Sequence, residues 1–438
     1  MKKLSLGQRI RKARKELGLT QEQLAGKDFT KGFISLVELN KTRPSLESLT
    51  VLAARLKKPL TYFLEDKLET RRDIDLLNMI GQGLLRKGEV SEAEDRFRRA
   101  AKLSQELGER QREAISNRNL ALALRARGRF DEALSLLGKA IEVLKNEGNR
   151  EELAATYFAL GTVYHHAGRL TDAIDAYQRS LQATEDLNYR DHSLLLRLYA
   201  NLGNAHWKSG NLEAARNFYG RALEISEHTD DYMTVGSTYM GLGLLYRDMG
   251  DYNSAIEYSS KALELFEVHD NVDLVADIHN NIGILYADSG DWERANKHYQ
   301  ESLRLRERIK DEVKKAYTYT ELARYYLHTG DLDRAEEYCR KSTSLLGDPK
   351  DSVEKGRVMT VMGNIARARG DHQRAATLLE ESLRLFEAAG AKGELANACS
   401  ELGSLYAEMG EVDKANRYLS LSVSYFKQVS GCRRQVNQ

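Results

Sequence analysis

Small residues recur along most of this chain at a nearly fixed spacing. From residue 73 onward a Gly returns at steps of 40 or 42 residues, and an Ala follows each such Gly by five positions. The recurring Gly residues are Gly88, Gly128, Gly168, Gly210, Gly250, Gly290, Gly330, Gly370 and Gly410. A period of this size is typical of a solenoid in which each unit is one supersecondary element. The spacing therefore predicts nine units between residues 73 and 430.

Each unit reads as a pair of helices joined by a turn. Gly168 illustrates the turn, because Gly enters the left-handed conformation at little cost and so ends a helix. An Asp or Asn near the start of the second helix, such as Asn211, Asp251 or Asp131, is expected to cap it. The pattern resembles tetratricopeptide repeats with longer units, and the resemblance implies an all-α protein built as a right-handed α-solenoid of nine ~40-residue repeats.

The first 66 residues have a different pattern, with five short apolar periodicities separated by turn and cap residues. The expected helices cover about 5–16, 21–25, 30–38, 46–56 and 59–64. The stretches Leu19–Ala25, Phe33–Glu38 and Lys41–Ser45 resemble the Xre/Cro-type helix-turn-helix domain of phage repressors. In that family the third helix enters the major groove of DNA. We therefore divide the chain into a head (1–66), a linker (67–72), the repeats (73–430) and a polar tail (431–438).

Matching positions give the residues expected at DNA. Thr30, Lys31, Gly32 and Ser35 fall where the family reads bases, while Gln21, Lys41 and Arg43 fall where it holds phosphates. The alternative is that the lysines and Arg43 form a solvated basic surface. Charge favours the first interpretation, because residues 1–66 hold 14 Lys or Arg and 7 Asp or Glu, whereas the other 372 residues hold 52 and 58.

One face of each unit's first helix is a candidate ligand groove. Positions 13, 10, 6 and 3 residues before the recurring Gly trace this face, which lines the concave side of tetratricopeptide arrays; three Asn lie beside it, nine residues before the Gly. The candidate groove residues are Asn119, Arg125, Phe158, Arg197, Asn201, Asn204, Trp207, Arg247, Asn281, Arg324, Asn364 and Arg367. Asn amides match the groups of a peptide bond, and Arg selects carboxylates. The alternative is that the Asn residues make inter-helix hydrogen bonds.

The combination of head and repeats resembles the peptide-pheromone-responsive regulators of Gram-positive bacteria. The resemblance implies a transcription regulator in which a peptide, or a folded protein partner, binds the groove and sets the spacing of two heads in a homodimer on a palindromic operator. The exposed end of the last unit is a second possible basis for a dimer, because solenoid ends need a polar cover. The alternative function is a protein-interaction scaffold whose head does not bind DNA.

Other chemistry is largely excluded by the sequence. We find no phosphate-binding loop, dinucleotide fingerprint or metalloprotease motif, and therefore expect no enzyme, no cofactor and no metal. No apolar run reaches the length of a membrane span, and Met1–Gly7 does not resemble a signal peptide. A cytoplasmic protein is expected.

Overall fold

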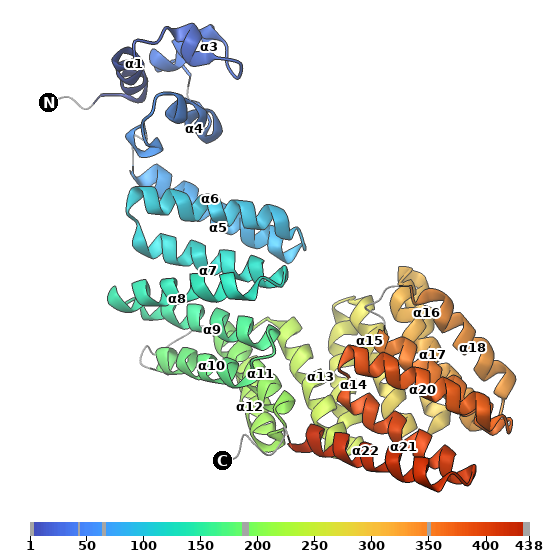
Figure 1. Cartoon of the computed structure of the whole chain (residues 1–438). Helices are drawn as coiled ribbons and strands as arrows, with labels where there is room; N and C mark the ends of the chain where they lie inside the picture. The colour runs from blue at the N-terminus through green and yellow to red at the C-terminus, as the bar shows by residue number, and fades with distance from the viewer. Residues whose placement is uncertain (1–3, 43, 64–66, 186–191, 348–351, 432–438) are drawn as a thin grey trace. The chain divides into compact units, whose positions relative to one another are not determined.

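The computed structural model describes residues 4–42, 44–63, 67–185, 192–347 and 352–431. All regular structure in these ranges is helical. The chain divides into two compact units, residues 1–189 (unit 1) and 190–438 (unit 2). Each unit is described by itself, and Figure 1 shows the order of their helices.

The head contains four α-helices and one 3-10 turn in its described part. They are α1 (Leu6–Glu16), α2 (Gln21–Ala25), α3 (Lys31–Glu38), α4 (Leu46–Arg55) and η1 (Leu60–Tyr62). The side chains of Ser5, Thr20, Thr30 and Ser45 cap the four α-helices by accepting a backbone N–H in the first turn. Asn40 has a φ of 56° and closes α3, as its sequence position predicts.

The head shares its hydrophobic core with the first hairpin of the repeats. Ile34, Leu52 and Phe63 belong to the same buried cluster as Ile74 of α5 and Leu103 of α6. Helix α5 begins at Lys67, so the segment interpreted as a linker forms the first turns of this helix. The head is consequently held against α5 and α6 by apolar packing as well as by the chain.

The remaining eighteen helices of the described residues pair as nine antiparallel hairpins, which confirms the predicted repeats. In unit 1 they are α5 (Lys67–Arg86) with α6 (Val90–Leu107), α7 (Arg110–Ala126) with α8 (Phe130–Asn146), and α9 (Arg150–His166) with α10 (Leu170–Glu185). In unit 2 they are α11 (His192–Lys208) with α12 (Leu212–Ser226), α13 (Tyr232–Asp248) with α14 (Tyr252–Val268), α15 (Val272–Asp288) with α16 (Trp292–Ile309), α17 (Glu312–Thr329) with α18 (Leu332–Leu345), α19 (Ser352–Ala368) with α20 (His372–Ala389), and α21 (Lys392–Glu408) with α22 (Val412–Gly431).

The recurring Gly ends the first helix of every hairpin, with φ between 73° and 89° at all nine positions. Asn211 and Asp251 cap the second helix as expected. The expectation was wrong for Asp131, because Arg129 occupies the cap position and Asp131 lies inside the first turn. Each of the nine hairpins is thus closed by one left-handed turn at its recurring Gly.

Candidate functional site

The exposed face of α3 carries the residues expected to read bases. Lys31 and Gly32 are exposed, Thr30 is exposed at the cap, and Ser35 is half-buried, whereas Ile34 points into the head core. Figure 1 shows α3 on the side of the head away from α5 and α6. The repeats of unit 1 therefore leave this face open.

Gln21 joins α2 to α3 through the end of its side chain. Its amide donates to Glu38 Oε2 at 2.9 Å, and Glu38 also accepts from Arg14 Nε at 2.5 Å and Nη2 at 3.0 Å. Burial alone would raise the pKa of Glu38, but the hydrogen bonds and charge of Arg14 together with Gln21 lower it below its usual value. One of the two amide N–H donors of Gln21 is thus occupied within the head, and Gln21 remains a predicted phosphate contact.

Two basic residues, Lys41 and Arg43, follow α3 in the sequence. Lys41 is exposed after the left-handed Asn40. Arg43 lies outside the described residues. Both remain predicted phosphate contacts.

In unit 1 the predicted groove residues have different surroundings. Asn119 is 3% exposed; its amide donates to Asn78 Oδ1 at 2.9 Å and accepts from Gln82 at 3.4 Å. These hydrogen bonds connect α5 and α7, which is the inter-helix role that the sequence left open. Arg125 is half-buried, and its buried Nε has no hydrogen-bond partner in the described part of the chain. Burial lowers the pKa of Arg125, and Tyr177 offsets this in part.

In unit 2 the first predicted residues are engaged within the repeats. Asn201 donates to the Arg197 carbonyl at 2.9 Å, and Arg197 Nε donates to the Ser193 carbonyl at 3.2 Å. Asn204 accepts from the Tyr219 hydroxyl at 2.6 Å, and Trp207 donates to Asp248 at 3.0 Å. Phe158 of unit 1 likewise packs on the ring of Tyr177, with centroids 5.8 Å apart.

Unit 2 contains a cavity of about 710 Å³, a volume within the usual range for ligand sites. Its walls include the predicted residues Arg247, Arg324 and Asn364. Other first-helix positions at the same offsets from the recurring Gly also line it: Thr320, Leu327, Arg357, Thr360, Asn397 and Ser400. Asn281 lines a separate cavity of about 20 Å³ together with Arg247. Arg367 is ion-paired with Glu401 and Glu408 instead.

The polar groups of the large cavity fall into two classes. Arg324 donates to Glu321 at 2.8 Å, and Arg357 to Glu394 at 2.5 Å, so these guanidinium groups are neutralised. Arg247 has no ion pair among the described residues, and Asn364 Oδ1 is buried without a hydrogen-bond partner there. A buried polar atom without a partner costs stability unless a ligand or water satisfies it. Among the described residues of its walls, the cavity therefore offers an unpaired guanidinium at Arg247 and a buried, unsatisfied acceptor at Asn364.

Comparison with known protein families covers most of the chain. A family model described as tetratricopeptide repeat matches residues 73–146, 152–228, 234–308, 274–348 and 312–388. The chain belongs to the tetratricopeptide repeat family. A second model, described as helix-turn-helix, matches residues 10–63, so the head of this tetratricopeptide repeat protein is a helix-turn-helix domain.

Individual relatives agree with this assignment. The chain is 28% identical over 115 residues to Protein KINESIN LIGHT CHAIN-RELATED 3 of Arabidopsis thaliana, a match to 26% of this chain and 18% of that protein's length. The apo form of the quorum sensor NprR from B. thuringiensis superposes with a TM-score of 0.58 at 16% identity, covering 82% of this chain and 99% of the other. The Rap conjugation gene regulator of plasmid pLS20, in complex with the Phr* peptide, gives 0.52 at 15%, covering 82% and 96%. At these identities the structures show a shared fold.

Several cavity residues of this tetratricopeptide repeat protein were missed by the sequence reasoning. Phe386 and Phe426, which contribute from α20 and α22, lie 16 residues after the recurring Gly. Trp292 opens α16 and stacks on His328 with ring centroids 4.3 Å apart. These residues belong to second helices or to helix ends, whereas the predicted groove residues all lie on first helices. An aromatic residue 16 positions after the recurring Gly is the sequence signal for Phe386 and Phe426.

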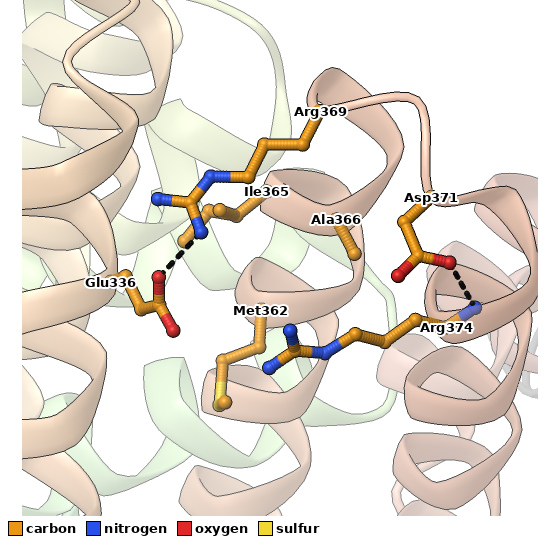
Figure 2. Close-up of a pocket in the computed structure, with 7 residues that line it drawn as sticks. All are labelled: Glu336, Met362, Ile365, Ala366, Arg369, Asp371 and Arg374. Carbon is orange, nitrogen blue, oxygen red and sulfur yellow. Dashed lines mark hydrogen bonds and ion pairs between the residues drawn. The ribbon is translucent and has the colours of Figure 1, made fainter.

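A smaller cavity of about 50 Å³ lies between α18, α19 and α20 (Figure 2). Arg369 donates to Glu336 at 2.7 Å across it, and Asp371 accepts from the backbone N–H of Arg374 at 3.1 Å. This volume suits a few water molecules and no larger ligand. The ion pair holds neighbouring hairpins together.

The described residues contain no group of three or more His, Cys, Asp or Glu placed to hold a metal ion. None of their helices combines the length and apolar character that crossing a membrane requires.

Proposed function

We propose that this protein is a non-catalytic, sequence-specific transcription regulator of the cytoplasm whose repeats sense a peptide or protein ligand. The observation that carries the proposal is the open face of α3 in a basic helix-turn-helix head, on the same chain as a cavity with unsatisfied polar groups. The head supplies DNA binding and the cavity supplies ligand recognition.

The head is suited to the major groove of DNA. A recognition helix needs an exposed face with donors near its N-terminus, and Lys31 and Thr30 supply these donors on α3. Gly32 allows close approach of the backbone. The excess of seven positive charges over residues 1–66 provides the sequence-independent attraction to phosphates.

The cavity of unit 2 is suited to a short peptide with an acidic group. Arg247 offers an uncompensated guanidinium to a carboxylate, and Asn364 offers an acceptor to a backbone N–H. Phe426, which is 45% exposed, supplies an apolar surface for a side chain. NprR and the Rap regulator, which share the fold, are described as a quorum sensor and as a peptide complex, and this supports the same ligand class here.

A single head makes few phosphate contacts, so useful affinity at physiological salt requires two heads. We therefore propose a homodimer on a palindromic operator with half-sites about one helical turn apart. Ligand binding then changes head spacing if the ligand has different affinities for two shapes of the repeats.

Enrichment of genomic DNA fragments bound by the full-length protein tests the proposal. We expect to recover a palindromic sequence. The logarithm of the affinity for this sequence should fall linearly with the logarithm of the salt concentration. Absence of any salt-dependent DNA shift would instead favour the second candidate, a protein-interaction scaffold with a head that does not bind DNA. Lys31→Ala is compared with Lys139→Ala, which removes an exposed lysine of the repeats. A larger loss of DNA affinity for Lys31→Ala shows that the head, and not overall charge, binds DNA.

A further inference from the structure

The last helix of the repeats, α22, exposes apolar side chains. Leu419 is 39% exposed, Leu421 36% and Val423 52%. The position of Leu419, nine residues after the recurring Gly, is buried in the preceding hairpins of unit 2; its occupants there are Tyr219, Ser259, Tyr299, Cys339 and Leu379. Tyr219 shows the reason, because its ring lies against both Gly203 of its own hairpin and Gly241 of the next. In α22 the surface that a following hairpin would cover is left open.

The composition of α22 is that of a contact surface and not that of a polar end cap. The position of Leu421, eleven residues after the Gly, is charged in all eight preceding hairpins: Arg99, Lys139, Arg179, Arg221, Lys261, Glu301, Lys341 and Glu381. The nine residues from Tyr418 to Phe426 contain no charge. The cores of protein interfaces are depleted of charged residues, whereas the free ends of solenoids are polar.

We infer that the outward face of α22, the exposed side that carries Ser420 and Ser424, packs against the same face of α22 in a second copy. The two helices run antiparallel, and a two-fold axis passes near Ser420. Asp413 lies seven residues before Ser420 and Lys427 seven residues after it, and seven residues are close to two helical turns. Both charges are therefore on the outward face with Ser420; both are exposed and have no ion pair among the described residues.

Charge complementarity selects a second copy as the occupant. In an antiparallel pair centred on Ser420, Asp413 faces Lys427 of the partner subunit, and symmetry repeats the contact at the other end. The small side chains of Ser420 and Ser424 allow the two helices to approach closely, with Leu419 and Leu421 on the flanks. A single helix pair buries less surface than a standard interface, so we expect a weak dimer whose population depends on protein concentration.

This surface deepens the proposed homodimer, and its test leaves DNA out so that a failure here is distinct from a failure of DNA binding. Light scattering and sedimentation velocity of the full-length protein measure the association. We expect a concentration-dependent dimer that Val423→Glu converts to monomer. Val313→Glu is the matched control, because Val313 is 49% exposed and lies in the first turn of α17, where an acidic residue is tolerated. The inference is overturned if the wild-type protein is still a monomer at a protein concentration on the order of 100 µM. It is also overturned if Val423→Glu leaves the dimer intact.

Charge exchange tests the antiparallel geometry. Asp413→Lys alone and Lys427→Asp alone each place like charges together twice per dimer, and each is expected to raise the dissociation constant several-fold at low salt. The double variant Asp413→Lys/Lys427→Asp restores opposite charges and is expected to return the constant close to that of the wild type. The pairing of Asp413 with Lys427 is overturned if neither single variant changes the dissociation constant. It is also overturned if the losses of affinity in the two single variants add up in the double variant. Circular dichroism confirms that each variant keeps its helices.

Discussion

Glu38 of α3 accepts two hydrogen bonds from Arg14 of α1, and both side chains are almost fully buried, with 3% and 11% of their side-chain areas exposed. The pair therefore ties the helix that carries the candidate base contacts to the first helix of the head. Removing one partner leaves a buried charge unpaired, which typically costs 3–5 kcal/mol, whereas replacing both with apolar residues is often nearly neutral.

The first prediction concerns this pair. Arg14→Met should lower the local stability of the head by about 3 kcal/mol, and Arg14→Met/Glu38→Leu should recover most of the loss. Because the pKa of Glu38 is lowered in the folded head, its contribution to stability is present above the ordinary Glu pKa and is lost as the pH falls through the lowered value. Hydrogen exchange of peptides from α1 and α3, followed from pH 7 downward, measures both effects. A single variant as protected as the wild type would contradict the prediction.

The second prediction sets two glycines of unit 1 against each other. A Cβ on Gly161 of α9 would lie 2.5 Å from Cδ1 of Tyr177, whereas a Cβ on Gly138 of α8 would meet no atom within 4 Å. Gly138→Ala should therefore stabilise its helix by up to about 1 kcal/mol. Gly161→Ala should destabilise by about 1–2 kcal/mol, because overpacking exceeds the helix gain. Hydrogen exchange of α8 and α9 checks the opposite signs, and changes of the same sign would refute the assigned packing.

The third prediction separates base contacts from phosphate contacts in the head. Lys31→Ala should weaken binding to the selected operator by about 1–3 kcal/mol more than binding to random DNA. Lys41→Ala should weaken both equally and reduce the salt slope by about 1. Fluorescence anisotropy titrations with both duplexes at several salt concentrations measure these quantities. Identical behaviour of the two variants would remove the distinction between the two roles.

The fourth prediction concerns a buried carboxyl group of unit 2. Burial raises the pKa of Glu354 to about 7, despite the neighbouring Thr320 and Arg357, and the charge of Glu321 adds to the rise. A raised Glu pKa means that the folded state holds the proton more tightly, so stability should fall as the pH rises from the ordinary Glu value to about 7 and then level off. Glu354→Gln should flatten this change in the thermal unfolding of the protein. The exposed Glu293→Gln serves as control, and a pH profile unchanged by Glu354→Gln would show that Glu354 is ionised throughout.

The repeating elements could be predicted from the sequence because they depend on local chemistry. Gly168 and its eight counterparts adopt a left-handed turn that Gly enters at little cost, and this local preference depends on no distant residue. The helices of the head could also be predicted from the sequence, because Thr20 and Thr30 cap them by accepting from backbone N–H groups only three residues away. The fifth head helix was expected to be longer than the single 3-10 turn observed at Leu60–Tyr62.

Whether a groove Asn is free to bind a ligand depends on the residue that faces it from the second helix of its hairpin. Asn204 and Asn364 occupy the same position, six residues before the recurring Gly. The residue nine positions after that Gly is Tyr219 in one hairpin and Leu379 in the other. Tyr219 donates to Asn204, whereas Leu379 has no group to offer Asn364, so the two amides differ although their helices look alike. Pairing these two positions along the chain would have separated structural Asn residues from candidate ligand contacts.

The last prediction uses this difference. Asn204→Ala should destabilise unit 2 by about 1–3 kcal/mol, because it leaves the buried Tyr219 hydroxyl without its acceptor. Asn364→Ala removes an atom that already lacks a partner, so it should leave thermal stability unchanged or slightly higher. The order should reverse for ligand binding: a peptide recovered by co-purification and identified by mass spectrometry should bind Asn364→Ala about tenfold more weakly in calorimetry, since one hydrogen bond is lost in the cavity. Asn364→Ala that binds this peptide as the wild type does would show that Asn364 does not contact the ligand.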